Sequence, residues 1–178
     1  SRASVGIDAP LITVEVHLSN GSPCFNLVGL PEASVREAKD RVRSALINSG
    51  FEFPAKRITV NLAPADLPKE GGRFDLPIAI GIIAASNQLT SNQLEGIELV
   101  GELALSGEIR SITGALPFTY ACSQAKRVAI LPVENAAEAS LIKHANIVPA
   151  NQLLDVFHHI AGQRILGLYQ AHSAEEQV

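Results

Sequence analysis

The most constraining feature of the chain is an apolar segment with almost no polar face. Residues 75–86 read DLPIAIGIIAAS. A helix with so little polar surface has to be covered on several sides, so it belongs in the middle of a core. Its apolar run, 76–85, is shorter than the roughly 18 residues that a membrane helix needs, and Pro77 and Gly81 interrupt it. The segment therefore predicts a buried helix over 75–86 and no membrane association.

Periodic patterns on both sides of this segment predict alternating strands and helices. Strands are expected at 11–18, 24–28, 57–63, 127–132 and 146–150, with two short strands within 98–112. Further helices are expected at 32–49, 113–126, 134–145 and 152–162. The turn sequence SNGSP between the first two strands favours a hairpin. The order of elements predicts an α/β (α+β) sandwich with a mixed sheet.

Composition limits the class of protein. The 178 residues fit one large domain, or one domain plus a tail, and the 47% hydrophobic content predicts a well-filled core. The net charge of −4 disfavours a surface that grips nucleic acid on all sides, although a local basic patch stays possible. Cys24 and Cys122, far apart and without a wider cysteine framework, favour a reduced cytoplasm. The absence of an initial Met and the loss of periodicity beyond about residue 171 are typical of an excised domain with a linker or frayed end.

The loop before the apolar helix, PADLPKEGGRFD, has two glycines but no phosphate-loop signature. Gly71 and Gly72 are followed by Arg73 and Phe74, where a phosphate loop needs Lys and a hydroxyl residue. On local chemistry the loop is a tight turn, with Asp75 as the cap of the helix. A G-x-S-x-G elbow, an H-E-x-x-H motif and a C-x-x-C motif are all missing, so the sequence predicts no metal site.

The helix expected at 32–49 carries a candidate phosphate-binding face. Arg36, Lys39 and Arg43 recur at spacings of three and four, which places them on one side, and Lys56 and Arg57 follow closely. The alternative is an ordinary solvated face, whose charge is partly cancelled by i,i+4 pairs of Glu32 with Arg36 and of Glu37 with Arg41. Because aromatic residues are only 4% of the chain, phosphate contact is a better expectation than base stacking.

Three long motifs resemble the N-terminal domain of the ComM/YifB family, bacterial proteins described as magnesium-chelatase-like AAA+ ATPases. They are FNLVGLPEASVREAKDRVRSALINSGFEFPAKRITVNLAPADLPKEGGRFDLPIAIGI, VGELALSGEIRSITGALP and AKRVAILPVENAAEA. The resemblance implies a fold like the proteolytic domain of Lon, itself similar to the second domain of a small-subunit ribosomal protein. It assigns residues 1–163 to this domain and 164–178 to a linker toward an AAA+ ATPase module.

The resemblance also implies a function for the whole protein. Relatives form hexamers that act as DNA helicases, promoting branch migration in natural transformation and recombination. ATP and Mg²⁺ belong to the AAA+ module, so we expect no cofactor in this chain. DNA and other copies of the protein are the expected partners, and the cytoplasm is the expected location.

The resemblance to Lon implies that both catalytic residues of the protease site are replaced in this chain. Arg73 stands where Lon has its nucleophilic Ser, and Leu116 aligns with its catalytic Lys. Since Arg cannot attack a carbonyl and Leu cannot accept a proton, we expect a non-proteolytic domain that is not an enzyme. Arg73 would pair with Glu70 or Asp75 and, with Lys69, fix the loop; the alternative is a contact with phosphate or a neighbouring subunit.

The role left for such a domain is DNA engagement, hexamer assembly, or both. Two other functions stay open at this stage. One is a divergent Lon-like peptidase. The other is a subunit-docking module of a magnesium-chelatase-like ATPase.

Overall fold

The computed structural model describes residues 1–69 and 71–170 of the chain, so the end expected to fray beyond 171 lies outside it. Strands are β1 (Thr13–Ser19), β2 (Cys24–Val28), β3 (Arg57–Ala63), β4 (Ile97–Leu99), β5 (Glu102–Leu103), β6 (Ile109–Arg110), β7 (Val128–Pro132) and β8 (Ile147–Ala150). Helices are α1 (Glu32–Asn48), α2 (Asp75–Ala85), α3 (Ala115–Gln124), α4 (Ala136–Ala139) and α5 (Leu153–Ile160), with short 3₁₀ turns at Ser91–Leu94 and Val133–Asn135. The mixed α/β class predicted from the sequence is confirmed.

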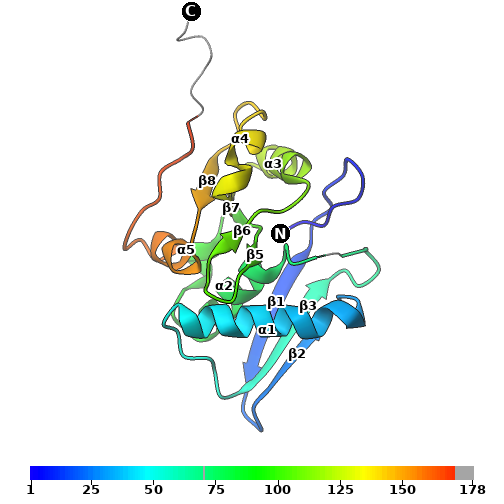
Figure 1. Ribbon diagram of the computed structural model, residues 1–178, viewed down its shortest axis with the longest axis vertical. Helices are drawn as coiled ribbons and strands as arrows, with labels where there is room; N and C mark the ends of the chain where they lie inside the picture. Colours follow the sequence, from blue (N-terminus) through cyan, green and yellow to red (C-terminus); the bar gives the residue numbers. More distant parts are fainter. Residues whose placement is uncertain (70, 171–178) are drawn as a thin grey trace, which may run out of the picture.

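One half of the molecule is the sheet β1-β3-β2 with α1 and α2 packed on one face, as Figure 1 shows. Alternation decides which face: Ile58, Val60 and Leu62 of β3 are buried under the helices, and the residues between them are exposed or half-buried. At Gly81 of α2, an added Cβ would lie 2.6 Å from the Val16 side chain of β1. This close approach explains the glycine within the helix and confirms that α2 lies buried in the core.

The predicted hairpin between the first two strands is wrong. β3 lies between them, antiparallel to β1 and parallel to β2, and Arg57 at its start is opposite both Ser19 and Cys24. The loop 20–23 therefore passes over the beginning of β3, where a Cβ on Gly21 would lie 2.8 Å from the Arg57 side chain. A short loop reaches across two strand spacings, about 10 Å, so a turn signal alone could not show whether a third strand intervenes.

The other half is a parallel sheet, β4-β7-β8, with α3 and α4 beside it. Instead of two short strands, residues 97–112 form three. β4 joins β7 in this sheet, whereas β5 and β6 form a separate antiparallel pair around the turn at Ser106 and Gly107. The continuous apolar run of β7 is buried from Ala129 to Pro132, as predicted for a strand covered on both faces.

The helix predicted at 134–145 is largely wrong, because α4 covers only four residues. Asn135, just before α4, is buried, and its side-chain amide both accepts from the Ile112 N–H and donates to the Ile112 carbonyl, each at 2.9 Å. After α4 the chain turns, and His144 adopts a positive φ of 65°. The bonds of Asn135 to Ile112 hold the start of the segment out of the helix, and the turn after Ala139 ends it, so tertiary structure overrides the local helical propensity.

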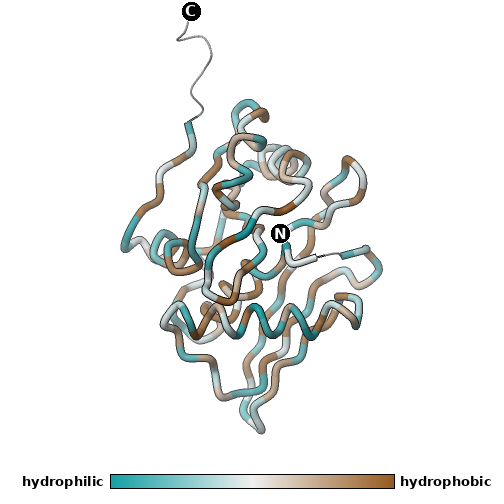
Figure 2. Tube along the Cα trace, in the orientation of Figure 1, coloured by the Kyte–Doolittle hydropathy of each residue, from teal (hydrophilic) through white to brown (hydrophobic). Residues whose placement is uncertain are grey.

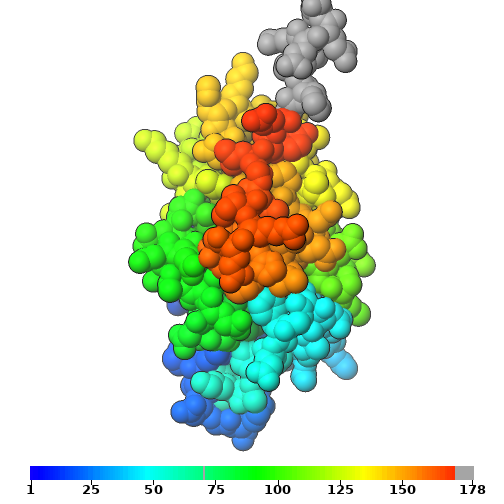
Figure 3. All heavy atoms as spheres, turned by 90° about the vertical axis from the view of Figure 1, so that its left-hand side faces the viewer, coloured from blue at the N-terminus to red at the C-terminus, as the bar shows by residue number. Residues whose placement is uncertain are grey.

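Residues 161–170 run along the surface of the body from α5, as the orange-to-red segment of Figure 3 shows. The Leu166 N–H donates to His159 Nδ1 at 2.9 Å, and the Tyr169 N–H donates to the Ile147 carbonyl at 2.8 Å. The start of the expected linker, 164–170, is therefore attached to the domain. Across the described residues, no helix has both the length and the apolar character needed to span a membrane.

Candidate functional site

Helix α1 has one buried and one charged face, which Figure 2 shows as alternating hydrophobic and hydrophilic positions. Its buried residues are Ala38, Val42, Ala45 and Leu46. On the other side Arg36 and Arg43 are exposed and Lys39 is half-buried. The spacing of the apolar residues thus turns the candidate DNA-binding residues of this helix away from the core.

Arg36 and Lys39 line an open hollow of about 800 Å³ between α1 and residues 27–30. Its apolar wall comes from the end of β2 and from Val35. Glu32 and Asp40 also lie on its rim, so the local charge is mixed. The hollow has the cations needed to contact a phosphate, but the two carboxylates weaken its positive potential.

Arg43 and Lys56 line a second hollow, of about 240 Å³, farther along β2. The Arg43 guanidinium carbon lies 5.3 Å from the centroid of the Phe53 ring, a cation–π arrangement that orients it. Arg57 is exposed at the start of β3, directly after Lys56. The structure therefore places Arg36 with Lys39, and Arg43 with Lys56, along α1. Arg57 instead lies on the face of β3 that points away from the helices.

The five candidate residues differ from Arg41 of α1 in making no ion pairs in the described chain. Within the part of the chain that the structure describes, no ion pair involves any of the five candidates, and the expected Glu32–Arg36 pair does not form. The expected Glu37–Arg41 pair does form, at 3.8 Å. The cationic charge of the candidate face is therefore available to a partner.

Arg41 points the other way, to the first residue of α2. Its Nε and Nη2 donate to the two carboxylate oxygens of Asp75 at 2.6 and 3.3 Å, and the Leu103 N–H donates to Asp75 at 3.2 Å. The predicted role of Asp75 as a helix cap is wrong, because its side chain makes these contacts and caps no backbone N–H of α2. Asp75 instead joins α1, α2 and β5 at one buried point.

Burial raises the pKa of Asp75 to about 6, and the bonds from Arg41 and Leu103 limit that rise. A carboxylate removed from water loses solvation of its charged form, so the neutral form gains. The loop before α2 is thus held by a buried acid whose protonation changes in a mildly acidic range. Sequence reasoning overlooked this pair, although Arg41 and Asp75 were both visible as charges beside apolar patterns.

Arg73 is buried and does not pair with Asp75. Its Nε donates to the Arg2 carbonyl at 3.0 Å and its Nη1 to the Thr113 carbonyl at 2.8 Å, while Nη2 is buried without a partner among the described residues. Burial lowers the pKa of this guanidinium. Arg73 therefore connects the loop to residue 2 and to the turn before α3, the helix that contains Leu116.

Lys69 and Glu70 are the other two loop residues that were predicted to fix the loop. Lys69 is buried, and its Nζ donates to the Pro64 and Leu67 carbonyls at 2.6 and 3.2 Å. Glu70 lies outside the described residues, so its predicted pairing with Arg73 is not described by the structure. A small hollow of about 180 Å³ lies between this loop, Glu102 and residues 111–113. Across residues 1–69 and 71–170, no group of His, Cys, Asp and Glu side chains is arranged to hold a metal ion.

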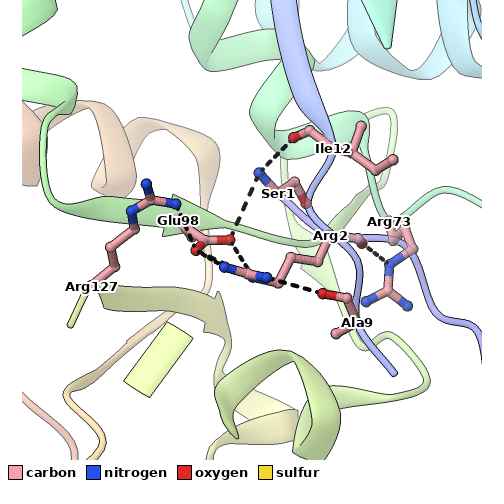
Figure 4. A network of polar contacts seen from close by, with 7 residues as sticks. All are labelled: Ser1, Arg2, Ala9, Ile12, Arg73, Glu98 and Arg127. Atoms are coloured by element: carbon pink, nitrogen blue, oxygen red, sulfur yellow. Dashed lines mark hydrogen bonds and ion pairs between the residues drawn. The ribbon is translucent and has the colours of Figure 1, made fainter. Parts of the chain in front are cut away.

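A second charged cluster, drawn in Figure 4, lies at the boundary between the two halves. Glu98 is buried and accepts hydrogen bonds from Arg2 at 2.9–3.3 Å and from Arg127 at 3.2 Å, and the Ser1 ammonium lies 4.0 Å away. These bonds fix the first residues of the chain against β4. The sequence of β4 did not predict this cluster. Glu98 stands between Ile97 and Leu99, so the alternating pattern suggests a solvent-facing position for it.

Comparison with known proteins gives the family. Residues 14–135 match the family model described as subunit ChlI of Mg-chelatase. The chain is 60% identical over 168 residues to "Competence protein ComM" of Haemophilus influenzae, and 55% and 53% identical over 166 residues to the uncharacterized proteins YifB of Salmonella typhimurium and Escherichia coli. Each alignment covers 93–94% of this chain but only 33% of the relative. The chain thus spans about a third of the length of these relatives.

The family match and the relatives agree with the motifs that suggested the family, which cover the buried helix, the loop before it and β7. The match includes the residues that form α1, the loop before α2, and α2 itself. It therefore covers the cationic residues of α1 and the buried Arg73. The chain belongs to the ComM/YifB family of magnesium-chelatase-like proteins, as an N-terminal domain of that family.

Proposed function

We propose that this chain is the non-proteolytic N-terminal domain of a ComM-type AAA+ DNA helicase, and that it contacts DNA phosphates. The observation that carries the proposal is the row of Arg36, Lys39 and Arg43 along the outer side of α1, with Lys56 beside Arg43 and with no ion pairs to these residues in the described chain. Phosphate contacts of this kind hold a protein on DNA without reading its sequence.

The biological role is part of the same proposal. It is supported by a relative that is 60% identical to this chain over 168 residues and is called "Competence protein ComM". The proposed whole protein promotes branch migration in natural transformation and recombination, works as a hexamer in the cytoplasm, and uses ATP and Mg²⁺ in its AAA+ module. In this account the domain keeps a Lon-like fold and has no enzymatic activity, because Arg73 and Leu116 replace the reacting pair.

DNA binding is tested on this chain by fluorescence anisotropy with labelled single-stranded, duplex and four-way-junction DNA at several salt concentrations. The test variant is Arg36→Ala/Lys39→Ala/Arg43→Ala. The matched control is Arg110→Ala/Lys126→Ala/Lys143→Ala, which removes three exposed cations in the other half of the molecule. Both triple variants change the net charge equally, so only a local contact distinguishes them.

The expected result is salt-dependent binding that the test variant weakens more than the control does. If each residue contacts one phosphate, the slope of log K against log salt decreases by about 0.9 per residue on duplex DNA. Equal losses of DNA affinity in the two variants would mean that binding depends on overall charge and not on a local contact. No binding at low salt would move DNA contact outside this domain.

The match to the Mg-chelatase subunit ChlI favours a second role, as a docking module between subunits. Sedimentation of the chain over a range of concentrations tests it, and self-association is the expected sign. The remaining alternative, a divergent peptidase, is tested by casein turnover, for which we expect no activity because the Ser–Lys pair is replaced.

A further inference from the structure

A groove of about 360 Å³ lies between the two halves of the molecule, bounded by strands that have open edges. Residues 11–14 form one wall and residues 97–99 of β4 form the other, with Pro77, Ile80 and Gly81 of α2 between them. In the described chain β1 pairs along its length only with β3, and β4 only with β7. The groove therefore runs between two strand edges over an apolar helix.

The first residues of the chain already form the beginning of a ladder at one end of this groove. The Ser1 amine donates to the Ile12 carbonyl at 3.2 Å and the Ile12 N–H donates to the Ser1 carbonyl at 2.9 Å. The Ala3 N–H donates to the Pro10 carbonyl at 3.0 Å, and Arg2 and Leu11 form an antiparallel bridge. Ser1 itself lines the groove.

The register of this ladder determines where a longer strand would go. Partners in an antiparallel ladder advance in opposite directions, so a residue joined to the Ser1 amine would face Thr13. The second would face Val14 and the fourth Val16. Because hydrogen-bonding positions alternate, the backbone groups of Val14 and Val16 face the same edge as those of Ile12.

The opposite wall offers a matching edge. The Gly96 carbonyl accepts from Val128 and the Val100 N–H donates to Ile130, so alternate residues of β4 face β7. The intervening residues, Ile97 and Leu99, consequently turn their backbone groups away from β7, toward the groove. An open edge of this kind is a site for strand addition.

We propose that this groove is a site for one further β-strand, antiparallel to β1, that continues the Ser1–Ala3 ladder when polypeptide is attached to the Ser1 amine. The second and fourth residues of such a strand lie on the same face as Val14 and Val16, which pack against the core, so apolar residues fit there. The first and third lie on the face of the exposed Thr13 and Glu15. The strand covers the apolar surface of α2 and brings the sheets of the two halves together.

Burial lowers the pKa of the Ser1 ammonium, although Glu98 opposes the shift. A strand extended from Ser1 replaces this ammonium by an amide, which keeps the hydrogen bond to the Ile12 carbonyl and has no charge to desolvate. The hydrogen bonding at Ser1 is therefore compatible with extension of the ladder.

The proposal is tested with two four-residue extensions of identical composition attached before Ser1. Val-Thr-Val-Thr places valine at the second and fourth positions before Ser1, in register with Val14 and Val16. Thr-Val-Thr-Val moves valine to the first and third positions, facing Thr13 and Glu15. A one-residue shift exchanges the two faces of a strand, so the second extension is the matched control.

Amide hydrogen exchange of Val14 and Val16 and the melting temperature are measured for the unextended chain and both variants. We expect the first extension to slow exchange at both amides at least tenfold and to raise the melting temperature above that of the control. A third variant, with Pro in place of the Val that faces Val14, removes one ladder N–H and should lose the protection. Equal behaviour of the two registers, or no protection in either, would overturn the proposal.

Discussion

Arg41 and Arg43 are two residues apart in one helix and have opposite environments. Arg41 lies against the buried Asp75, whereas Arg43 is exposed and lies over the ring of Phe53. Two residues correspond to a rotation of about 200° around a helix, which is enough to place them on opposite faces. The comparison shows that the same residue type stabilises the domain on one face of α1 and is available to a partner on the other.

The largest expected effect comes from breaking the inward pair. Arg41→Ala leaves the Asp75 carboxylate buried without its cation, so we expect the free energy of unfolding at pH 7.5 to fall by about 3 kcal/mol. Arg43→Ala removes only an exposed cation–π contact and should cost less than about 1 kcal/mol. Urea denaturation of both variants measures the difference. Equal costs would show that the two faces of α1 do not differ in this way.

A pH titration examines the same pair without removing a side chain. The folded pKa of Asp75, about 6, lies above its ordinary value of 3.8, so the folded state holds the proton more tightly. The stability that this proton contributes is present below pH 4 and is lost as the pH rises through about 6, and it amounts to about 3 kcal/mol.

The check is urea denaturation between pH 4 and 7 for the native chain and for Asp75→Asn, which cannot ionise. We expect the variant to lack this part of the pH dependence. In Arg41→Ala the loss of unfolding free energy relative to the native chain should be smaller at pH 5 than at pH 7.5, because Asp75 can take up a proton at pH 5. A native profile identical to that of Asp75→Asn would contradict the assigned pKa.

On the outward face the expected effect is on DNA and not on folding. Single substitutions Arg36→Ala, Lys39→Ala and Arg43→Ala should each weaken binding at low salt by about tenfold or less, since each removes one phosphate contact. Anisotropy titrations measure this loss, with Lys126→Ala as the control. Loss of binding in Arg41→Ala equal to that in Arg43→Ala would mean that the comparison does not extend to DNA.

The smallest effect expected is on the stability of the outward variants. Arg36→Ala and Lys39→Ala remove side chains that have no ion-pair partner among the described residues, so their unfolding free energies should stay within about 0.5 kcal/mol of the native value. Thermal melts are sufficient to measure this. A larger loss in either variant would assign that residue a structural role.

Much of the architecture followed from periodicity. The alternation of β3, the helical spacing of α1 and the apolar composition of α2 each predicted an element close to its observed bounds. The hairpin failed because strand order depends on where β3 inserts, which a local turn signal does not contain. The helix expected at 134–145 failed at its start, where the Asn135 side chain bonds to the distant Ile112, and at its end, where the chain turns after Ala139.

The candidate site divides in the same way. The spacing of Arg36, Lys39 and Arg43 indicated that they share a face, and the structure adds Lys56 beside Arg43 but leaves Arg57 on the other face of the sheet. The partners of Arg73 were not predictable, because they are the carbonyls of Arg2 and Thr113, which carry no sequence signal. Glu98 was missed for a related reason: a single acid in a short strand acquires meaning only from the cations that fold around it.

By itself the sequence determined the elements that repeat locally: a central buried helix, an amphipathic basic helix and strands with one buried face. It also determined the family, through long motifs. Tertiary structure alone decided the strand order, the pairing of Arg41 with Asp75 and the groove that continues from Ser1. The physical reason is distance along the chain: periodicity records which way neighbouring side chains point, whereas buried charges and open strand edges are defined by residues tens of positions apart.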